Sequence, residues 1–93
     1  MSAPLTRDGD RLVFAGPLDR AAVAALWPQA LAQAAGAACF DLRAVERVDS
    51  AGLALLAELA VRAGGPVRIE GTPPGLVELR TAYRLDAGLG YAR

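Results

Sequence analysis

The sequence predicts an α/β fold in which a small mixed β-sheet carries packed helices, with the elements in the order β-β-α-β-α-β-α. Two observations lead to this prediction. Short apolar or alternating segments of strand length take turns along the chain with longer segments whose apolar residues recur at helical spacing. Turn formers and helix-capping residues, above all Asp19 and Asp49, stand at the boundaries between them. Residues 1–93 contain neither an internal repeat nor a linker-like stretch, so we expect them to form one domain.

The first two strands are predicted close to the N-terminus. Residues 11–15 have the composition of a strand, and an Asp-Gly turn former at positions 8–9 precedes them. Leu5 is expected in a short partner strand across that turn, which makes a hairpin. Gly16 and Pro17 are expected to stop the strand, because both residues are unfavourable inside a sheet.

A helix is predicted after this hairpin. Asp19 is placed to cap a helix over about residues 20–34, and Gly36 ends it. Pro28 lies inside this helix and should kink or split it, because proline has no amide hydrogen to donate. The residues expected along one side of the helix are Val23, Trp27 and Leu31, with Leu26 and Ala30 beside them.

The middle of the chain is predicted to form a strand followed by a second helix. The apolar run 37–42 is typical of a packed strand, and the buried-looking Val48 leads into an Asp-Ser turn. Asp49 and Ser50 are both good N-cap residues, since a short side-chain oxygen can accept hydrogen bonds from the unpaired amides of a first helical turn. The helix is expected over residues 51–61 and is closed by a Gly-Gly pair.

The last part of the chain is predicted to form a strand and a third helix. Residues 67–70 alternate between apolar and charged side chains, which indicates a half-covered strand. A Thr-Pro-Pro segment at positions 72–74 starts the helix, and residues 85–91 are expected to form a short turn or a single helical turn. The inner face of this third helix is expected to carry Leu76, Leu79 and Tyr83.

The second helix is expected to expose an apolar patch. At about 100° per residue, Glu58 and Arg62 fall on one face, which is therefore the outward one. Ala51, Ala54 and Leu55 share that face with them. An outward patch of small and apolar residues beside a helix N-terminus is typical of a surface that binds another protein. The opposite, inward face is expected to carry Leu53, Leu56, Ala57 and Ala60.

Composition argues against several classes of function. Hydrophobic residues make up 54% of the chain and the formal net charge is zero, which argues against disorder and against a nucleic-acid partner. His and Lys are absent, so the chain has neither an imidazole base or metal ligand nor a Walker-type phosphate loop. Cys39, the single cysteine, is expected to be a packed strand residue. We therefore expect neither catalysis by this chain nor a bound cofactor or metal.

The chain is expected to be cytoplasmic and not to insert into a membrane by itself. No segment reaches the roughly 18–20 apolar residues that cross a bilayer. The N-terminus lacks the hydrophobic core of a signal peptide, and a single free thiol is typical of the cytoplasm.

The order of elements and three motifs resemble the STAS family, which includes anti-sigma factor antagonists and the tails of sulfate transporters. The motifs are Gly-Pro-Leu-Asp at 16–19, Phe-Asp-Leu at 40–42 and Val-Asp-Ser-Ala-Gly-Leu at 48–53, of which the Asp-Ser-x-Gly-Leu loop is the most specific. The resemblance extends over about residues 12–86. Three further segments are similar to the branch of the family that serves as the small cytoplasmic partner of a phospholipid-transport ABC ATPase. These segments are 25–27, 52–56 and 83–85.

This resemblance implies a partner-binding protein that supports an ABC-transporter ATPase in phospholipid transport and outer-membrane lipid asymmetry, held at the inner membrane through its partner complex. The alternative is an anti-sigma factor antagonist that binds an anti-sigma factor kinase and is regulated by phosphorylation of Ser50. Both functions would use the same surface. The predicted partner-binding or regulatory residues are Ser50, Asp49, Ala51, Gly52, Ala54, Leu55, Glu58 and Trp27.

A plainer interpretation stands beside each of the chemically distinctive residues. In STAS proteins the hydroxyl residue directly after this Asp contacts the partner or is regulated, but Ser50 is also explained as a helix cap. Many antagonists carry a second hydroxyl where this chain has Ala51, which disfavours a phosphorylation switch. Asp49 could serve only to hold the loop, Trp27 could be a core residue, and Glu58 is explained as half of a solvated ion pair.

Overall fold

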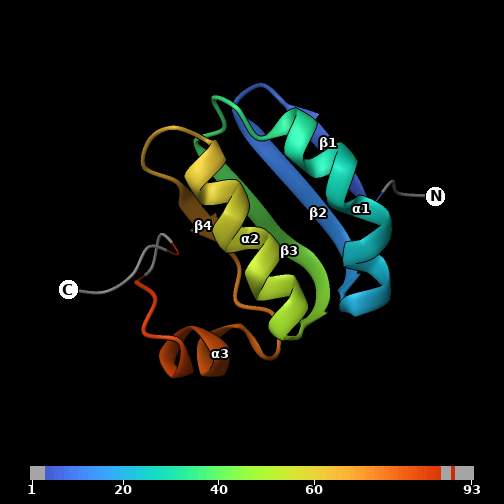
Figure 1. Cartoon of the computed structure of the whole chain (residues 1–93), viewed down its shortest axis with the longest axis vertical. Helices are drawn as coiled ribbons and strands as arrows, with labels where there is room; N and C mark the ends of the chain where they lie inside the picture. Colours follow the sequence, from blue (N-terminus) through green and yellow to red (C-terminus); the bar gives the residue numbers. More distant parts are fainter. Residues whose placement is uncertain (1–3, 87–88, 90–93) are drawn as a thin grey trace.

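A computed structural model describes residues 4–86 and 89 of the chain. Its elements follow the predicted order (Figure 1), and the α/β fold is the one expected from the sequence. The strands are β1 (Leu5–Asp8), β2 (Arg11–Leu18), β3 (Cys39–Val48) and β4 (Arg68–Glu70), and the helices are α1 (Arg20–Gln33), α2 (Ser50–Arg62) and α3 (Leu76–Ala82).

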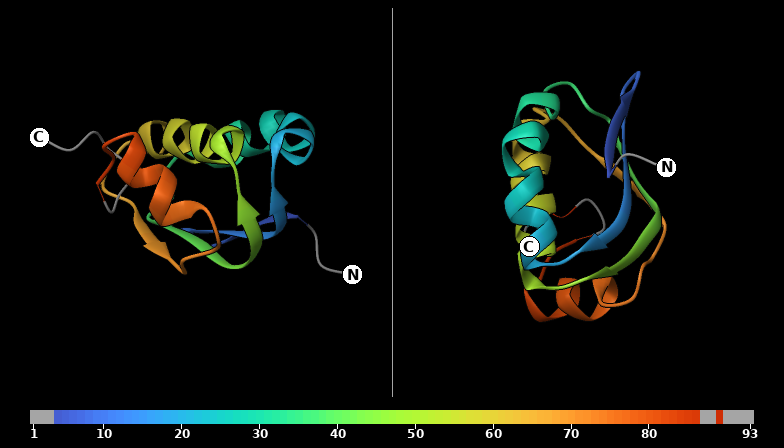
Figure 2. Two further views of the ribbon diagram at one scale, coloured as in Figure 1. Left: turned by 90° about the horizontal axis from the view of Figure 1, so that it is seen from below. Right: turned by 90° about the vertical axis from the view of Figure 1, so that its right-hand side faces the viewer.

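The four strands form one mixed sheet in the order β1-β2-β3-β4. β1 and β2 pair antiparallel as the predicted hairpin, whereas β2, β3 and β4 run parallel. Parallel neighbours require crossover connections, and α1 and α2 supply them on the same face of the sheet (Figure 2). The opposite face carries no helix in the part of the chain that the structure describes.

The core lies between the sheet and this helical layer. Leu12 and Phe14 on β2 and Phe40 and Leu42 on β3 alternate inward, and each is almost completely buried. The rings of Phe14 and Phe40 meet edge to face, with their centroids 5.9 Å apart. Burial of each such side chain contributes about 1.5–3 kcal/mol, so this central pair of strands anchors the helices above it.

The prediction that Gly16 and Pro17 stop the second strand is wrong, because β2 continues through both residues to Leu18. The pairing of β2 with β3 shifts its register between Gly16 and Leu18, and Gly16 has a φ of 80°, so the chain accommodates the two residues in a bulge. β1 pairs with β2 only as far as Phe14, so the missing amide hydrogen of Pro17 costs no ladder bond on that side.

β3 extends well beyond the apolar run that predicted it. Arg43, Glu46 and Arg47 are exposed, whereas Val45 and Val48 are buried and stand opposite Gly16 and Leu18 of β2. A neighbouring strand of matching length therefore holds this charged segment in the sheet, although its residues do not follow a simple alternation.

Pro28 does not split the first helix, which is continuous from Arg20 to Gln33. Pro28 and Ala24 are both exposed, so the Ala24 carbonyl that loses its helical partner faces water. The buried residues of the first helix are Val23, Leu26 and Ala30, while Trp27 and Leu31 lie half-buried at the margin of the predicted face.

The third helix forms in the predicted part of the chain, but it begins at Leu76, two positions after the Thr-Pro-Pro segment that was expected to start it. Leu76 is buried and Leu79 partly so, as expected. Tyr83 was expected on the inner face, yet it is 51% exposed, because α3 lies at the end of the sheet and only its first turn reaches the core. Leu85 and Asp86 follow a turn, and most of the tail predicted over residues 85–91 lies outside the described residues.

Candidate partner-binding site on helix α2

The site begins at the junction between β3 and α2, where Asp49 is the single residue between the two elements. Its backbone is extended, and its Oδ1 accepts a hydrogen bond from the Gly52 amide at 3.0 Å, which makes it the N-cap of α2. Its Oδ2 accepts from the amide of Arg20, the first residue of α1, at 3.1 Å. These hydrogen bonds, with that from Gly52 the strongest, lower the pKa of the Asp49 carboxyl. Of the two capping candidates, Asp49 therefore does the capping, and Ser50 is the exposed first residue of the helix.

Gly52 allows the first turn of α2 to lie directly on the end of β2. A Cβ atom at this position would stand 2.1 Å from the carbonyl oxygen of Leu18 and 2.9 Å from its Cβ. The amide of Asp49 donates to the same Leu18 carbonyl at 3.3 Å. Any side chain larger than hydrogen would push α2 away from the sheet, so the glycine of the Asp-Ser-x-Gly motif is required by packing.

A second aspartate caps the neighbouring helix with the same chemistry. Asp19 accepts from the Ala22 amide at 3.0 Å, and its other oxygen pairs with the exposed guanidinium of Arg47 at 2.9 Å. The two helix starts thus lie side by side at the carboxyl ends of β2 and β3, each with a carboxylate at the positive end of its dipole.

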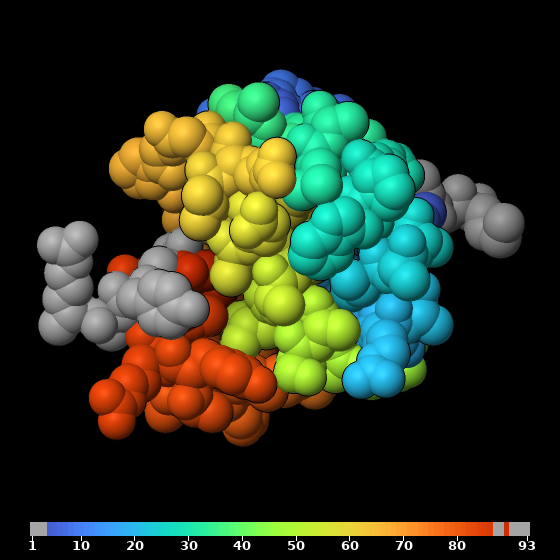
Figure 3. Space-filling view, viewed as in Figure 1, coloured from blue at the N-terminus to red at the C-terminus, as the bar shows by residue number. Residues whose placement is uncertain are grey.

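Helix α2 runs along the centre of the helix-covered face, between α1 and α3 (Figure 3). Its outward stripe consists of residues spaced by three or four positions, among which Val61 is 76% exposed. Glu58, half-buried on this stripe, pairs with the exposed Arg62 at 3.2 Å, a contact of little energetic weight. The stripe residues are Ser50, Ala54, Ala57, Glu58 and Val61.

The expected outward position of Leu55 is wrong, because this side chain is completely buried. By helical spacing Leu55 lies on the opposite flank of α2 from Leu53 and Ala57. Helix α1 packs beside α2 (Figure 1), and the complete burial of Leu55 indicates that α1 and the sheet cover its flank. Ala57, expected to face inward, is only half-buried, so the outward stripe is rotated about the helix axis away from α1.

A shallow groove of about 590 Å³ lies along the outward stripe, between α2 and the segment after α3. Ala54, Ala57 and Val61 form its α2 wall, and Tyr83 and Leu85 contribute from the segment after α3. The exposed apolar surface of this protein therefore continues from α2 into the C-terminal segment.

Trp27 lies on the flank of α1 that faces α2. Gln29 and Gln33, on the opposite flank of α1, meet β1: Gln29 donates to the Leu5 carbonyl, and Arg7 donates to the Gln33 carbonyl. Half-buried, Trp27 packs against the core and keeps part of its side chain at the surface. A role of Trp27 in partner contact stays a prediction.

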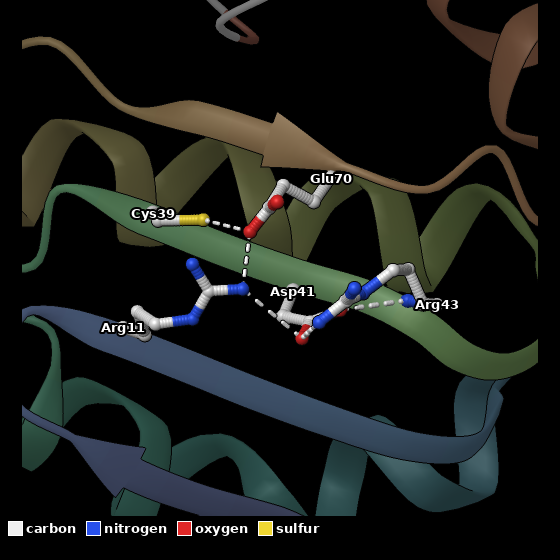
Figure 4. A network of polar contacts seen from close by, with 5 residues as sticks. All are labelled: Arg11, Cys39, Asp41, Arg43 and Glu70. Carbon is white, nitrogen blue, oxygen red and sulfur yellow. Dashed lines mark hydrogen bonds and ion pairs between the residues drawn. The ribbon is translucent and has the colours of Figure 1, made fainter.

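A polar network that the sequence did not predict covers the helix-free face of the sheet (Figure 4). Asp41 accepts from the amide of Arg43 at 3.1 Å, from its Nε at 3.0 Å and from its Nη2 at 2.7 Å. Arg11 on β2 joins Asp41 at 3.3 Å and also pairs with Glu70 on β4, to which the thiol of Cys39 donates at 3.1 Å. The Arg43 guanidinium beside Asp41 holds the pKa of that carboxyl well below its usual range.

This network ties three strands together. Cys39 is buried, as predicted, and burial together with the hydrogen bond to Glu70 raises the pKa of its thiol, which favours the protonated form. The sequence does contain a signal for this network. Cys39, Asp41 and Arg43 occupy alternate positions of one strand and therefore share its outer face.

Two further structural features bear on function. Across residues 4–86 and 89, no cluster of three or more His, Cys, Asp or Glu side chains is arranged to hold a metal ion. Within the same part of the chain, every helix is too short or too polar to span a membrane.

The fold and the Asp-Ser-x-Gly junction define a class of protein, and sequence comparison identifies it. A family model described as "Mlab, STAS domain" matches residues 1–91, so the chain belongs to the STAS family. The chain is also 37% identical over 82 residues to the "Intermembrane phospholipid transport system binding protein MlaB" of Escherichia coli (strain K12), with 85% of this chain and 84% of the relative covered. The protein of the same name from Shigella flexneri matches to the same extent. The predicted resemblance to STAS proteins, and within them to the phospholipid-transport branch, is confirmed.

Proposed function

We propose that this chain is a non-catalytic subunit that binds the ATPase of a phospholipid-transporting ABC complex and supports its assembly or activity. The observation that carries the proposal is the exposed stripe of small and apolar side chains on α2, with Ala54, Ala57 and Val61 at its centre. The names of the two MlaB relatives supply the transport system.

The stripe is suited to close contact with another protein. Alanines at positions 54 and 57 let a partner element approach the helix backbone closely. Val61 contributes an apolar side chain whose full burial would stabilise the complex by about 1.5 kcal/mol or more. Ser50 stands at the N-terminal end of the stripe, where a partner could accept or donate a hydrogen bond.

The site residues divide between two roles in this proposal. Ser50, Ala51, Ala54 and Glu58 face outward or half outward and are proposed to contact the ATPase, with Trp27 at the margin. Asp49 and Gly52 shape the helix start instead of offering a contact surface. Leu55 is left out because it is buried.

The proposal includes the place of the protein in the cell. We infer that residues 1–93 act as one cytoplasmic domain that reaches the inner membrane only through the ATPase complex. Transport across or between membranes would then be carried out by the partner proteins, with ATP hydrolysis on the ATPase.

The test is a pull-down of the proposed ABC ATPase from the native cell, with Ala54→Arg as the disrupting variant. Arg at position 54 places a charge in the middle of the stripe at an exposed site, so the fold should survive while ATPase binding falls. Ala32→Arg is the matched control, because Ala32 is an exposed alanine near the end of α1. Ser50→Asp should act like Ala54→Arg, because a carboxylate suits a helix N-terminus but not an apolar contact.

Two results would contradict the proposal. Equal ATPase binding by Ala54→Arg and Ala32→Arg would place the interface elsewhere on the molecule. Capture of an anti-sigma factor kinase, and no ATPase, from the native cell would favour the antagonist function instead.

A further inference from the structure

The starts of α1 and α2 are joined through one carboxylate. Asp49 accepts from the Gly52 amide in its own helix and from the Arg20 amide at the start of α1, at 3.0 and 3.1 Å. A capping side chain needs only one acceptor oxygen for its own helix. The second oxygen of Asp49 accepts from one of the unpaired amides at the start of α1, so a single carboxylate links the N-termini of two helices.

We propose that Asp49 is a positioning residue for partner docking, because its two hydrogen bonds hold the outward stripe of α2 in register with α1. This inference rests on the proposed function, since the surface that it positions is the proposed ATPase-binding stripe. Asp49 is not itself a contact residue in this account. It acts through the orientation of Ser50 and Ala54 relative to the Trp27 flank of α1.

The surroundings of Asp49 support a positioning role. Gly52 lies against the Leu18 carbonyl with no room for a side chain, and the Asp49 amide donates to that same carbonyl. Leu18 directly precedes Asp19, the cap of α1. The first turn of α2 is therefore fixed to the end of β2 through backbone contacts and to α1 through the Asp49 carboxylate.

Loss of this tie should weaken binding more than folding. The apolar contacts between α1 and α2 resist separation of the helices, but they are not directional and permit small rotations. A hydrogen bond from an amide to a carboxylate is directional and strong. A surface that is no longer held in one orientation must be ordered when the partner binds, and that cost appears in the affinity.

Arg20 offers a substitution that removes only the donor. It is the first residue of α1, where proline is favoured, and Asp19 before it has an extended backbone with φ −102° and ψ 177°, as a residue before proline requires. Arg20→Pro therefore deletes the amide hydrogen that Asp49 accepts and leaves α1 able to form. Arg20→Ala is its control, because it removes the same exposed side chain but keeps the amide.

A second pair of variants changes the acceptor of this hydrogen bond, the Asp49 carboxylate. In Asp49→Asn the side-chain oxygen can still cap α2, but the amide group cannot accept from Arg20. Asp19→Asn is the matched control: it keeps a cap for α1 and loses only the contact with the exposed Arg47 side chain.

The first measurement is the dissociation constant for the ABC ATPase, with unfolding in urea monitored in parallel. Arg20→Pro and Asp49→Asn should weaken binding about tenfold, the factor that corresponds to one charge-assisted hydrogen bond. Arg20→Ala and Asp19→Asn should stay within about twofold of the original protein. Binding by Arg20→Pro equal to that by Arg20→Ala would overturn the inference.

The second measurement needs no partner. Residual dipolar couplings of the isolated protein report the orientation of α2 relative to α1, and Arg20→Pro should change or broaden it while Arg20→Ala does not. An unchanged orientation in Arg20→Pro would also overturn the inference. The proposed function fails separately, when Ala54→Arg binds the ATPase as well as the original protein does.

Discussion

Gly52→Ala tests the packing of the α2 start, because the added methyl group has no room. Its carbon would lie 2.1 Å from the Leu18 carbonyl oxygen, whereas such contacts are almost never closer than 3.0 Å, so α2 must withdraw by about an ångström. That movement would stretch the Asp49–Leu18 hydrogen bond, now 3.3 Å, and the tie to Arg20. It would also lift the buried Leu56 from the sheet.

The expected loss of stability can be worked out from these contacts. Overpacking alone costs about 1–3 kcal/mol, and weakening of the cap adds about 1 kcal/mol. Alanine recovers about 1 kcal/mol through its higher helix propensity. The free energy of unfolding of Gly52→Ala should therefore fall by about 1–3 kcal/mol, and each kcal/mol lowers the melting temperature by about 4–8 °C.

Urea unfolding of Gly52→Ala measures this loss, and Gly65→Ala is the control. A Cβ atom at Gly65 meets no atom within 4 Å, so this change should lie within about 0.5 kcal/mol of the original protein. Equal unfolding midpoints for the two variants would refute the argument that Gly52 is required by close approach to Leu18.

Three further predictions follow from burial, backbone strain and charge. Leu55→Ala should lower the free energy of unfolding by about 2–5 kcal/mol in urea melts, because the side chain is fully buried, whereas an outward Leu55 would cost almost nothing. Arg84 has a φ of 57°, so Arg84→Gly should raise stability by about 1 kcal/mol in a thermal melt, while Thr81→Gly inside α3 should lower it; a loss in both would show that Arg84 is not strained. Because the pKa of Asp41 is lowered in the folded protein, its ionised carboxylate stabilises the fold fully at pH values above the ordinary carboxyl pKa, and this contribution declines as the pH falls below that value. Asp41→Asn should therefore make the free energy of unfolding depend less steeply on pH in the acid range. An unchanged acid slope would contradict the role of Asp41.

Features that depend on near neighbours in the chain were predictable from the sequence. Asp19 and Asp49 cap helices because a short carboxylate reaches the amide three residues on, whatever the rest of the fold does. The hairpin and the core alternation of Phe40 and Leu42 follow from local turn chemistry and the two-residue period of a strand, although the turn lies at residues 9–10, one position beyond the predicted Asp-Gly pair. The family motif at 48–53 was recognisable for the same reason, since its residues act together within one turn.

Other features were decided by which elements became neighbours. Leu55 is buried because α2 packs against both α1 and the sheet. A helical projection of the sequence separates one apolar face from one polar face, and it does not show that a second helix will cover part of the polar face. Pro17 remains in a strand because β1 ends before it reaches that position.

The sequence by itself determined the order of elements, both helix caps and membership in the STAS family, because each depends on residues within a few positions of one another. Only the tertiary structure decided which stripe of α2 faces outward and where the second oxygen of Asp49 goes. It also brought Arg11 and Glu70 together across β3, although 59 positions separate them in the chain. Contacts of this kind depend on the register of neighbouring strands and on the packing of one helix against another, which are properties of the assembled sheet.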